Sequence, residues 1–290
     1  MRIPANIQFF CNQVGTYGVK DKATCMSVFN EAISCGYRLF DTGTLYGNDE
    51  FIGDVVYDRL ASKELKRDDI FIETKIAPWQ HGKDNTRTAV VDSLKRLKLS
   101  SLDLVLVHWP GVAKTPPKDP KNKAMRSETW QTLESLVSEG KIKSIGVSNY
   151  TSSHLEDLLS YCKIKPTVNQ VEFHPMCYQK NLLEFCKKNS IYLQAYSSLG
   201  SSQSKPPGWT VLFGSEIVKS IAAKHNRTIP QVLLRWGLQH DCLLIPKTSK
   251  VANLKPNLDI FDFQLDDDDM SKLNSLNQDK HFCWNPTDIL

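Results

Sequence analysis

The chain has 290 residues, of which 41% are hydrophobic and 23% are charged, a composition typical of globular proteins that excludes a disordered chain. Its 36 Lys and Arg against 32 Asp and Glu leave a net charge of +4, too small and too dispersed to favour nucleic acid as a partner. No segment reaches the ~20 consecutive apolar residues of a membrane span, and the first residues lack the cleavage site of a signal peptide.

Eight cysteines are spread along the chain, and none forms a CxxC pair or has a His at zinc-finger spacing. We therefore expect free thiols, no metal and a cytoplasmic location, where thiols stay reduced. The length fits either one α/β barrel or two smaller domains.

Short apolar runs of strand length recur along the chain. We predict strands at residues 7–17, 38–42, 69–76, 102–109, 142–148, 168–173, 191–197 and 242–247. Several of these runs are almost wholly apolar, as in LDLVLVHW, which indicates strands buried on both faces of a parallel sheet.

The segments between the strands carry helix signals. Apolar residues recur at helical spacing over 25–32. Residues 153–156 and 228–231 fit the capping box, which satisfies free amides at a helix start. The acidic run 266–269 fits a solvated first helical turn better than a metal site.

Alternating strands and helices predict an α/β fold. We predict one domain over residues 1–290, a single (β/α)8 TIM barrel with long βα loops near 111–125 and 198–213 and a short C-terminal tail. A doubly wound parallel sheet is the alternative, and it is weaker because no G-x-G-x-x-G follows the first strand.

Polar residues stand where the predicted strands end. The ends of barrel strands converge on one mouth, and they offer Asp41, Lys75, His108, Ser148, Asn149, Glu172 or His174, Tyr196, Ser197, Lys247 and Thr248. A single buried Asp or His usually makes a structural hydrogen bond. Asp41, Lys75 and His108 on successive strands, with Tyr46 close behind Asp41, instead indicate a site.

These four residues have a coherent chemical use. An ammonium group near a Tyr favours the phenolate and lowers the phenol pKa from about 10. Asp41 would hold Lys75 charged, and His108 would donate a hydrogen bond to a carbonyl oxygen. The set therefore predicts proton transfer to an oxygen that gains negative charge, as when hydride adds to a carbonyl group.

A place for a hydride-carrying cofactor follows the last strand. Lys247, Thr248, Ser249 and Lys250 precede a predicted helix, and TIM barrels often bind phosphate at this position. Tyr196 can stack on a flat ring. The four-residue run also fits an ordinary solvated turn.

Seven segments, in order along the chain, resemble the signatures of the aldo-keto reductases. They are GYRLFDTGTLYGNDEFIG (36–53), IETK (72–75), LDLVLVHWP (102–110), GKIKSIGVSN (140–149), VNQVEFHP (168–175), YSSLG (196–200) and LLIPKT (243–248). The resemblance implies a (β/α)8 barrel, generally monomeric and without metal, that reduces aldehydes and ketones with NADPH.

The resemblance also implies a role for each matching residue. It makes Tyr46 the proton donor, Asp41 and Lys75 its tuning pair and His108 the residue that orients the carbonyl group. The implied cofactor-binding residues are Thr16, Tyr17, Asp41, Ser148, Asn149, Gln170, Tyr196, Ser197, Leu199, Ser201, Lys247, Thr248, Ser249, Asn253 and Asn257. Tyr17, Trp79 and Trp109 would line the substrate pocket, although they also fit plain core aromatics.

The chain departs from the family pattern near the cofactor. Asn253 stands where the family usually has Arg, and Pro256 replaces a Glu that contacts adenine. Gln203 and Gly18 replace the acid and the Lys that latch the cofactor loop. These departures weaken the case for a tight preference for NADPH. We expect NADPH to be preferred still, because Lys247 can meet its 2′-phosphate, with NADH used at lower efficiency.

The sequence thus predicts a monomeric, cytoplasmic, NADPH-dependent reductase of small carbonyl substrates: aldehydes first, with ketones or aldoses as further candidates. One alternative is a Schiff-base barrel in which an unpaired Lys75 is the nucleophile. The other is a barrel that binds nucleotides or serves as a structural protein without turnover.

Overall fold

The strand-forming segments pair in the order in which they occur in the chain. The structure, a computed structural model, describes residues 13–19, 21–201 and 205–290. Its parallel strands are β1 (Gln13–Gly15), β2 (Leu39–Asp41), β3 (Phe71–Ile76), β4 (Leu102–Val107), β5 (Ile142–Ser148), β6 (Val168–Glu172), β7 (Tyr192–Tyr196) and β8 (Leu243–Leu244). A parallel bridge between Gly15 and Lys247 joins the two edges, so the sheet closes into a barrel.

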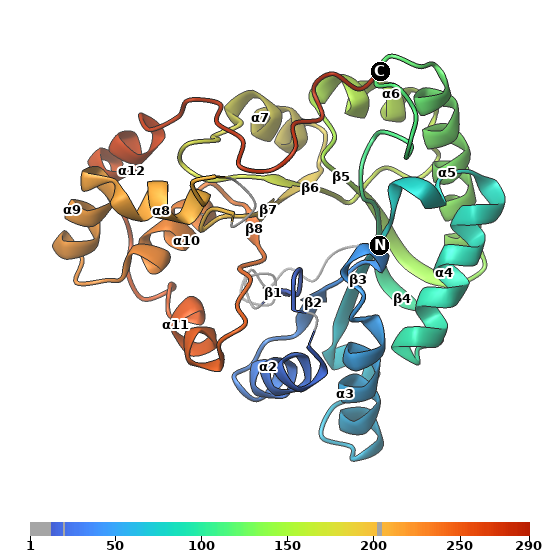
Figure 1. The fold of residues 1–290 in the computed structure, drawn as a ribbon, viewed down its shortest axis with the longest axis horizontal. Coiled ribbons are helices and arrows are strands. Elements are labelled where there is room, and N and C mark those ends of the chain that lie inside the picture. The colour runs from blue at the N-terminus through green and yellow to red at the C-terminus, as the bar shows by residue number, and fades with distance from the viewer. Residues whose placement is uncertain (1–12, 20, 202–204) are drawn as a thin grey trace.

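Helices follow the strands and lie around the outside of the barrel (Figure 1). The α-helices are α2 (Lys22–Ser34), α3 (Asp49–Ala61), α4 (Lys83–Leu97), α5 (Lys121–Ser138), α6 (Ser152–Tyr161), α7 (Lys180–Lys188), α8 (Gly208–Gly214), α9 (Glu216–Lys224), α10 (Ile229–Gln239), α11 (Leu254–Leu258) and α12 (Asp267–Asn274). The 3-10 turns are η1 (Thr44–Tyr46), η2 (Arg67–Asp69), η3 (Pro78–Gln80) and η4 (Val251–Asn253). The predicted (β/α)8 barrel is confirmed, and the doubly wound alternative is wrong.

The main core lies between the strands and the surrounding helices. Every residue of β4 is buried, as its almost continuous apolar sequence predicts for a strand covered on both faces. On α2, the buried residues include Cys25, Val28, Phe29 and Ala32, which is the predicted apolar face.

The last strand is much shorter than the predicted strand 242–247. β8 contains only Leu243 and Leu244, because Pro246 has no N–H with which to continue the ladder. The carbonyl of Pro246 still accepts a hydrogen bond from the Gly15 N–H at 3.3 Å. The described ends of the other strands lie within two residues of the predicted bounds, and residues 7–12 of the predicted first strand lie outside the described part of the chain.

Of the two capping boxes predicted at helix starts, one is confirmed and one is wrong. The predicted capping box at 153–156 is wrong, because α6 begins at Ser152 and Thr151 is its cap. There the ring of His154 accepts the Thr151 N–H at 3.2 Å, which the S/T-x-x-E/Q pattern does not include. The box formed by Thr228 and Gln231 is confirmed.

The acidic run 266–269 opens α12, as predicted, but its last member Asp269 is buried and not solvated. Asp266 caps the helix by accepting the Asp269 N–H at 2.9 Å. Carboxylate oxygens of Asp266, Asp268 and Asp269 lie within 4.8 Å of one another. Lys224 forms ion pairs with Asp266 at 2.6 Å and with Asp269 at 2.9 Å, and Nε2 of His225 lies 2.6 Å from Oδ2 of Asp269, so neighbouring side chains already contact these carboxylates.

The two predicted long loops are partly helical. Helix α5 begins at Lys121, inside the first of them, and α8 begins at Gly208, inside the second.

After α12 the tail crosses one end of the barrel, where Figure 1 shows it in dark red running above β6 towards α6. Within the described residues, no helix has the length and apolar character needed to cross a membrane.

Candidate active site

The four residues predicted to carry the chemistry lie together at one end of the barrel. Asp41 is the last residue of β2, Lys75 lies near the end of β3, and His108 directly follows β4. Tyr46 ends the turn η1. All four side chains are buried, with Lys75 only 1% exposed, so each needs partners within the protein.

Lys75 is held by the end of β2. Its Nζ forms an ion pair with Oδ1 of Asp41 and donates to the carbonyl oxygen of Thr42 at 2.9 Å. A Cβ at Gly43 would lie 3.4 Å from the Lys75 Cβ, so the loop packs closely on the aliphatic stem. The ammonium group then lies 4.8 Å from the ring centre of Tyr46.

The phenol of Tyr46 holds its proton at neutral pH. Burial raises its pKa well above the ordinary value, and the nearby Asp41 carboxylate raises it further. This is opposite to the expected lowering by Lys75. The physical reason is that burial disfavours the charged phenolate by more than the nearby Lys75 ammonium, which is paired with Asp41, favours it.

His108 faces Tyr46 as a neutral imidazole. The two rings are 6.0 Å apart at an interplanar angle of 74°. Burial lowers the pKa of His108 to about 3, and the charge of Lys75 adds to the effect. Its Nδ1 is buried without a hydrogen-bond partner among the described residues. The site therefore places one neutral ring and one protonated phenol side by side.

Four residues expected near a nicotinamide ring, Ser148, Asn149, Gln170 and Tyr196, lie together where β5, β6 and β7 end. Register pairs Ser148 with Gln170, and the Ser148 hydroxyl donates to the Gln170 carbonyl at 2.8 Å. The Tyr196 hydroxyl donates to Oδ1 of Asn149 at 2.8 Å, and Nδ2 of Asn149 donates to the His108 carbonyl at 2.9 Å. This amide and hydroxyl cluster beside a flat ring suits a carboxamide-bearing cofactor.

The Gln170 side chain turns into the barrel interior. Its Nε2 lies 3.0 Å from Oδ1 of Asp41, 2.6 Å from Oε1 of Glu73 and 2.9 Å from Oε1 of Gln194. Sequence reasoning missed Glu73 and Gln194 as members of the site. An acid two residues before Lys75 in an apolar strand was the available signal, because side chains alternate along a strand.

In the segment expected around the adenosine phosphate, residues 248–253 are joined to one another by hydrogen bonds. The Thr248 Oγ1 accepts from the Lys250 N–H at 3.0 Å and from Nδ2 of Asn253 at 3.2 Å. Lys247 and Ser249 are exposed, while Asn257 is buried. No ion pair between described residues uses Lys247 or Lys250, in contrast to surface lysines such as Lys22 and Lys98, so both cations are available to an anion.

The predicted cofactor loop follows β7. The Gly200 N–H donates to the Ser197 carbonyl at 2.7 Å, and the Gly208 N–H donates to the Ser201 carbonyl at 2.6 Å. Leu199 is half-buried in this loop. Gln203, the expected replacement of the family's acidic latch, lies outside the described residues.

Thr16 directly follows β1; it is buried, and its hydroxyl lies 3.4 Å from Oδ1 of Asn48. Gly18 adopts a positive φ of 78° and has no atom within 4 Å of the place of a Cβ. Tyr17 is 45% exposed, and its ring lies 5.1 Å from that of Tyr46.

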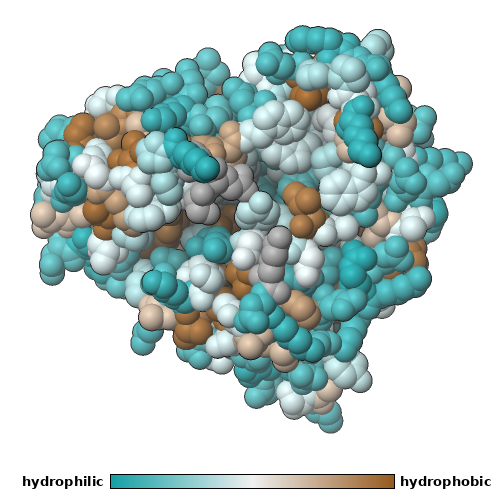
Figure 2. Space-filling view, viewed as in Figure 1, coloured by the Kyte–Doolittle hydropathy of each residue, from teal (hydrophilic) through white to brown (hydrophobic). Residues whose placement is uncertain are grey.

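Aromatic rings border the mouth of the site. Trp79 in η3 is 52% exposed, and the ring of Trp109 lies 6.4 Å from that of His108. Trp109 also packs against Trp284 of the tail at 4.5 Å, a residue that sequence reasoning did not include. Figure 2 shows this face hollowed near its centre, with apolar and intermediate residues around the hollow.

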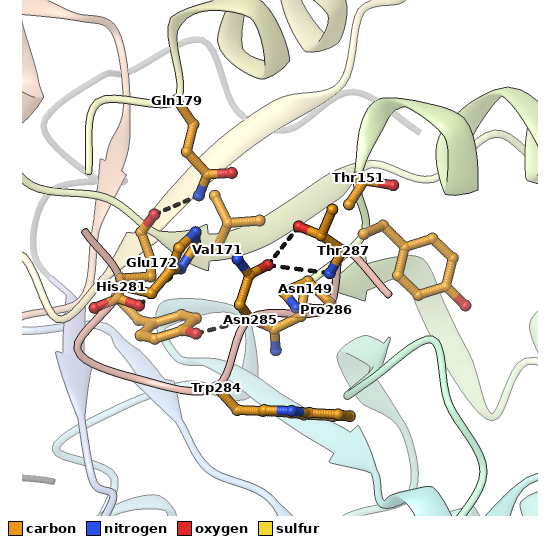
Figure 3. A pocket seen from close by; sticks show the side chains of 12 residues that line it. Asn149, Thr151, Val171, Glu172, Gln179, His281, Trp284, Asn285, Pro286 and Thr287 are labelled. Carbon is orange, nitrogen blue, oxygen red and sulfur yellow. Dashed lines mark hydrogen bonds and ion pairs between the residues drawn. The ribbon is translucent and has the colours of Figure 1, made fainter. Parts of the chain in front are cut away.

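Glu172 fixes the tail over the strand ends. Its carboxylate oxygens lie 3.1 Å from His174 Nε2 and 3.1 Å from His281 Nδ1, and they accept the Phe282 and Cys283 N–H groups. Figure 3 shows the tail beside these strand ends. A small pocket there is lined by Asn149, Tyr150, Thr151, Val171, Glu172, Gln179, Tyr196, His281, Trp284, Asn285, Pro286 and Thr287.

Known proteins are similar to this chain over most of its length. Residues 11–278 match the Aldo/keto reductase family. The chain is 40% identical over 279 residues to a glyoxal reductase of Bacillus subtilis (strain 168), which covers 96% of this chain and 92% of that protein. It is 39% identical over 284 residues to aldose reductase B of Dictyostelium discoideum, covering 93% of this chain and 89% of the relative.

Solved structures agree with the sequence relatives. An aldo-keto reductase from a Medee basin deep-sea metagenome library matches with a TM-score of 0.84 at 35% identity, covering 94% of this chain and 93% of that one. The Bombyx mori aldo-keto reductase in complex with NADP matches with a TM-score of 0.83 at 28% identity, covering 93% and 90%. The chain therefore belongs to the aldo/keto reductase family, and it is an NAD(P)-dependent oxidoreductase that acts on carbonyl groups.

Proposed function

We propose that this protein reduces aldehydes, and also ketones or aldoses, to alcohols with NADPH, and that Tyr46 donates the proton. The observation that carries the proposal is the buried Tyr46 phenol, which lies beside the Lys75 ammonium and faces the neutral ring of His108. Together these groups offer one transferable proton and one hydrogen-bond donor to a single carbonyl oxygen.

The chain's own residues prepare the carbonyl oxygen for reduction. When bound, the reduced nicotinamide supplies the hydride. Neutral His108 donates a hydrogen bond to the oxygen and so orients the carbonyl group. Tyr46 transfers its phenolic proton to the same oxygen as negative charge develops there. Lys75, fixed by Asp41 and Thr42, stabilises the phenolate that Tyr46 becomes.

The cofactor would lie along the strand ends from β5 to β8. Ser148, Asn149 and Gln170 would hold the carboxamide, and Tyr196 would stack on the nicotinamide ring. Ser197, Leu199 and Ser201 would cover the pyrophosphate. Lys247 and Thr248 would contact the adenosine 2′-phosphate, and Ser249, Asn253 and Asn257 would complete the cofactor site. NADH lacks that phosphate and would be used at lower efficiency.

Small carbonyl compounds suit the rim that surrounds Tyr46. Tyr17, Trp79 and Trp109 would contact the substrate, since two of these rings are about half exposed at the mouth. The named relatives include a glyoxal reductase and an aldose reductase, which supports aldehydes as the first substrates to test.

The Schiff-base alternative is disfavoured by the contacts of Lys75. A nucleophilic Lys must be neutral and free to attack, whereas the Lys75 ammonium is paired with Asp41. We further propose that the chain acts as a monomer formed by one barrel. The seven described cysteines are free, which supports a cytoplasmic location.

The test is the Tyr46→Phe variant. Loss of the general acid should lower kcat for an aldehyde such as glyoxal by about 10²- to 10⁴-fold. NADPH binding, followed by quenching of intrinsic fluorescence, should change little because the ring and its packing remain. Turnover close to that of the wild type would refute the role of Tyr46. Absence of NADPH oxidation by the wild type across an aldehyde panel would refute the proposed function itself.

A further inference from the structure

A second buried carboxyl group lies beneath the ion pair of the active site. Glu73 precedes Lys75 by two residues on β3, so both side chains point into the barrel, and register places Glu73 opposite Asp41. Glu73 is fully buried. Its Oε1 accepts from Nε2 of Gln170 at 2.6 Å, and its Oε2 accepts from Nε2 of Gln194 at 2.9 Å.

The surroundings of Glu73 contain one cation for two carboxyl groups. Lys75 Nζ lies 4.0 Å from Oε1 of Glu73, but it is bonded directly to Asp41 and to the Thr42 carbonyl. Two other titratable groups face the layer of Asp41, Glu73 and Lys75, and both are neutral: Tyr46 from η1 and His108 after β4. The remaining polar groups there are the side-chain amides of Gln13 from β1, Gln170 from β6 and Gln194 from β7.

Ionising both carboxyl groups in this buried layer has a high free-energy cost. Burial of an uncompensated carboxylate is strongly unfavourable, and like charges nearby add to that cost. Burial raises the pKa of Glu73 well above its ordinary value, and the Asp41 charge raises it further. Of the two carboxyl groups, Asp41 is the one that bonds directly to Lys75.

We propose that Glu73 is a positioning residue that acts as a neutral, protonated acid, holding Gln170 in place and leaving the Lys75 ammonium paired with Asp41 alone. The inference rests on the proposed function in one respect, since Asp41 and Lys75 matter to turnover through Tyr46. Glu73 itself contacts neither substrate nor cofactor in this proposal.

Ionisation of Glu73 would disturb this arrangement. A second carboxylate 4.0 Å from Lys75 would share the ammonium with Asp41 and draw it away from Tyr46. The Tyr46 phenolate formed during turnover would then be less stabilised. Burial and the Asp41 charge raise the pKa of Glu73, so in this proposal the acid keeps its proton at neutral pH and loses it only as the pH rises further.

The protonation state can be read without turnover. In the infrared spectrum of the full-length wild type at neutral pH, a buried protonated carboxyl group gives a C=O band distinct from carboxylate bands. We expect this band to be absent from Glu73→Gln and present in the exposed control Glu216→Gln, whose side chain is 87% exposed. A wild-type spectrum without a band that depends on Glu73 would overturn the proposal, whether or not the protein reduces aldehydes.

The pH profile tests the effect on catalysis. Glu73→Gln mimics the neutral acid, whereas Glu73→Leu removes both hydrogen-bonding atoms at similar volume. We expect kcat of Glu73→Leu to fall about tenfold below that of Glu73→Gln at neutral pH, because Gln170 and Gln194 lose their acceptors. The alkaline limb of kcat should shift upwards in Glu73→Gln.

The profile separates the two proposals from each other. An alkaline limb identical in the wild type and Glu73→Gln, or equal kcat values for the Gln and Leu variants, would overturn the role of Glu73. Fluorescence titration with NADPH verifies that each variant is folded. If the wild type oxidises no NADPH with any aldehyde, the proposed function fails, and the infrared band still decides the protonation of Glu73.

Discussion

The backbone N–H of Phe282 donates a hydrogen bond to Oε1 of Glu172 at 2.8 Å, which ties the C-terminal tail to the end of β6. The Phe282 ring stacks on His174 at 4.7 Å, and it lies so close to Gly208 that a Cβ there would clash with it. Trp284, two residues further on, packs against Trp109. One carboxylate therefore positions contacts with both the cofactor loop and the proposed substrate pocket.

We predict that Glu172→Gln loosens the tail. Burial opposes ionisation of Glu172, but hydrogen bonds from His174 and His281 outweigh it and lower its pKa to about 2. The amide replaces one anionic acceptor with a donor that faces N–H groups. Stability should fall by about 1–3 kcal/mol, measured by urea unfolding, and KM for aldehydes should rise more than kcat falls because Trp284 is displaced.

The matched control is Glu184→Gln on α7, whose exposed pair with Lys180 spans 3.8 Å. Exposed pairs contribute little, so this variant should behave as the wild type does.

The depressed pKa of Glu172 also makes stability depend on pH. Its stabilising contribution is complete above about pH 4.3, the pKa of Glu in the unfolded chain. It is lost as the pH falls towards 2. Unchanged stability and KM in Glu172→Gln would show that the tail is held by other contacts.

We predict that His108 acts as a neutral donor throughout the physiological range. Its pKa of about 3 implies that kcat/KM has no acid limb from this residue between about pH 5 and 8. His108→Leu should lower kcat/KM by about 10²-fold, while His108→Gln, which retains a donor, should lose less. A limb near pH 6.5 in the wild type that disappears in His108→Leu would contradict a neutral ring.

The depressed pKa of His108 also makes the folding stability depend on pH. The unfolded chain takes up a proton at about pH 6.5, and the folded chain resists it until about pH 3. Folding stability from this group therefore decreases as the pH falls through that interval. His108→Leu should make the pH dependence of unfolding shallower there, as measured by urea denaturation at several pH values.

We predict that Asn253→Arg strengthens the preference for NADPH over NADH. Asn253 bonds to Thr248 beside the exposed Lys247, but it has no charge for a 2′-phosphate. A guanidinium group offers a bidentate contact, which should widen the NADPH to NADH ratio of kcat/KM by about tenfold. Asn253→Gln, which adds length without charge, should leave the ratio unchanged. Equal use of both cofactors by the wild type would defeat the expected preference.

We predict that hydride transfer is at least partly rate-limiting. No ion pair between described residues clamps the loop 197–201, and Gly18 has no side chain to offer one. Loops that must open for product release often limit turnover when they are clamped. NADPH deuterated at the transferred position should therefore give an isotope effect on kcat above unity. An effect of unity with a burst of NADPH oxidation in stopped-flow measurements would show that release dominates.

The local pattern of the sequence determined the barrel and predicted where a site would lie on it. Continuous apolar strands such as Leu102–Val107 require cover on both faces, and alternating helices provide it. Polar residues that end such strands cannot be left unpaired in an apolar core. The strand pattern therefore predicts Asp41, Lys75 and His108 as site candidates, with Tyr46 close behind Asp41 as the proton donor that the family resemblance also implies.

Only the tertiary structure decided which charges face one another. Glu73 and Gln194 are far apart in sequence yet bond across the barrel interior, and Glu172 reaches tail residues more than a hundred positions away. A pKa depends on burial and on neighbours from other strands, which is why the Tyr46 pKa is raised where the sequence predicted a lowered one. The sequence shows where a charged group is placed along a strand, but closure of the barrel sets the partners that balance it.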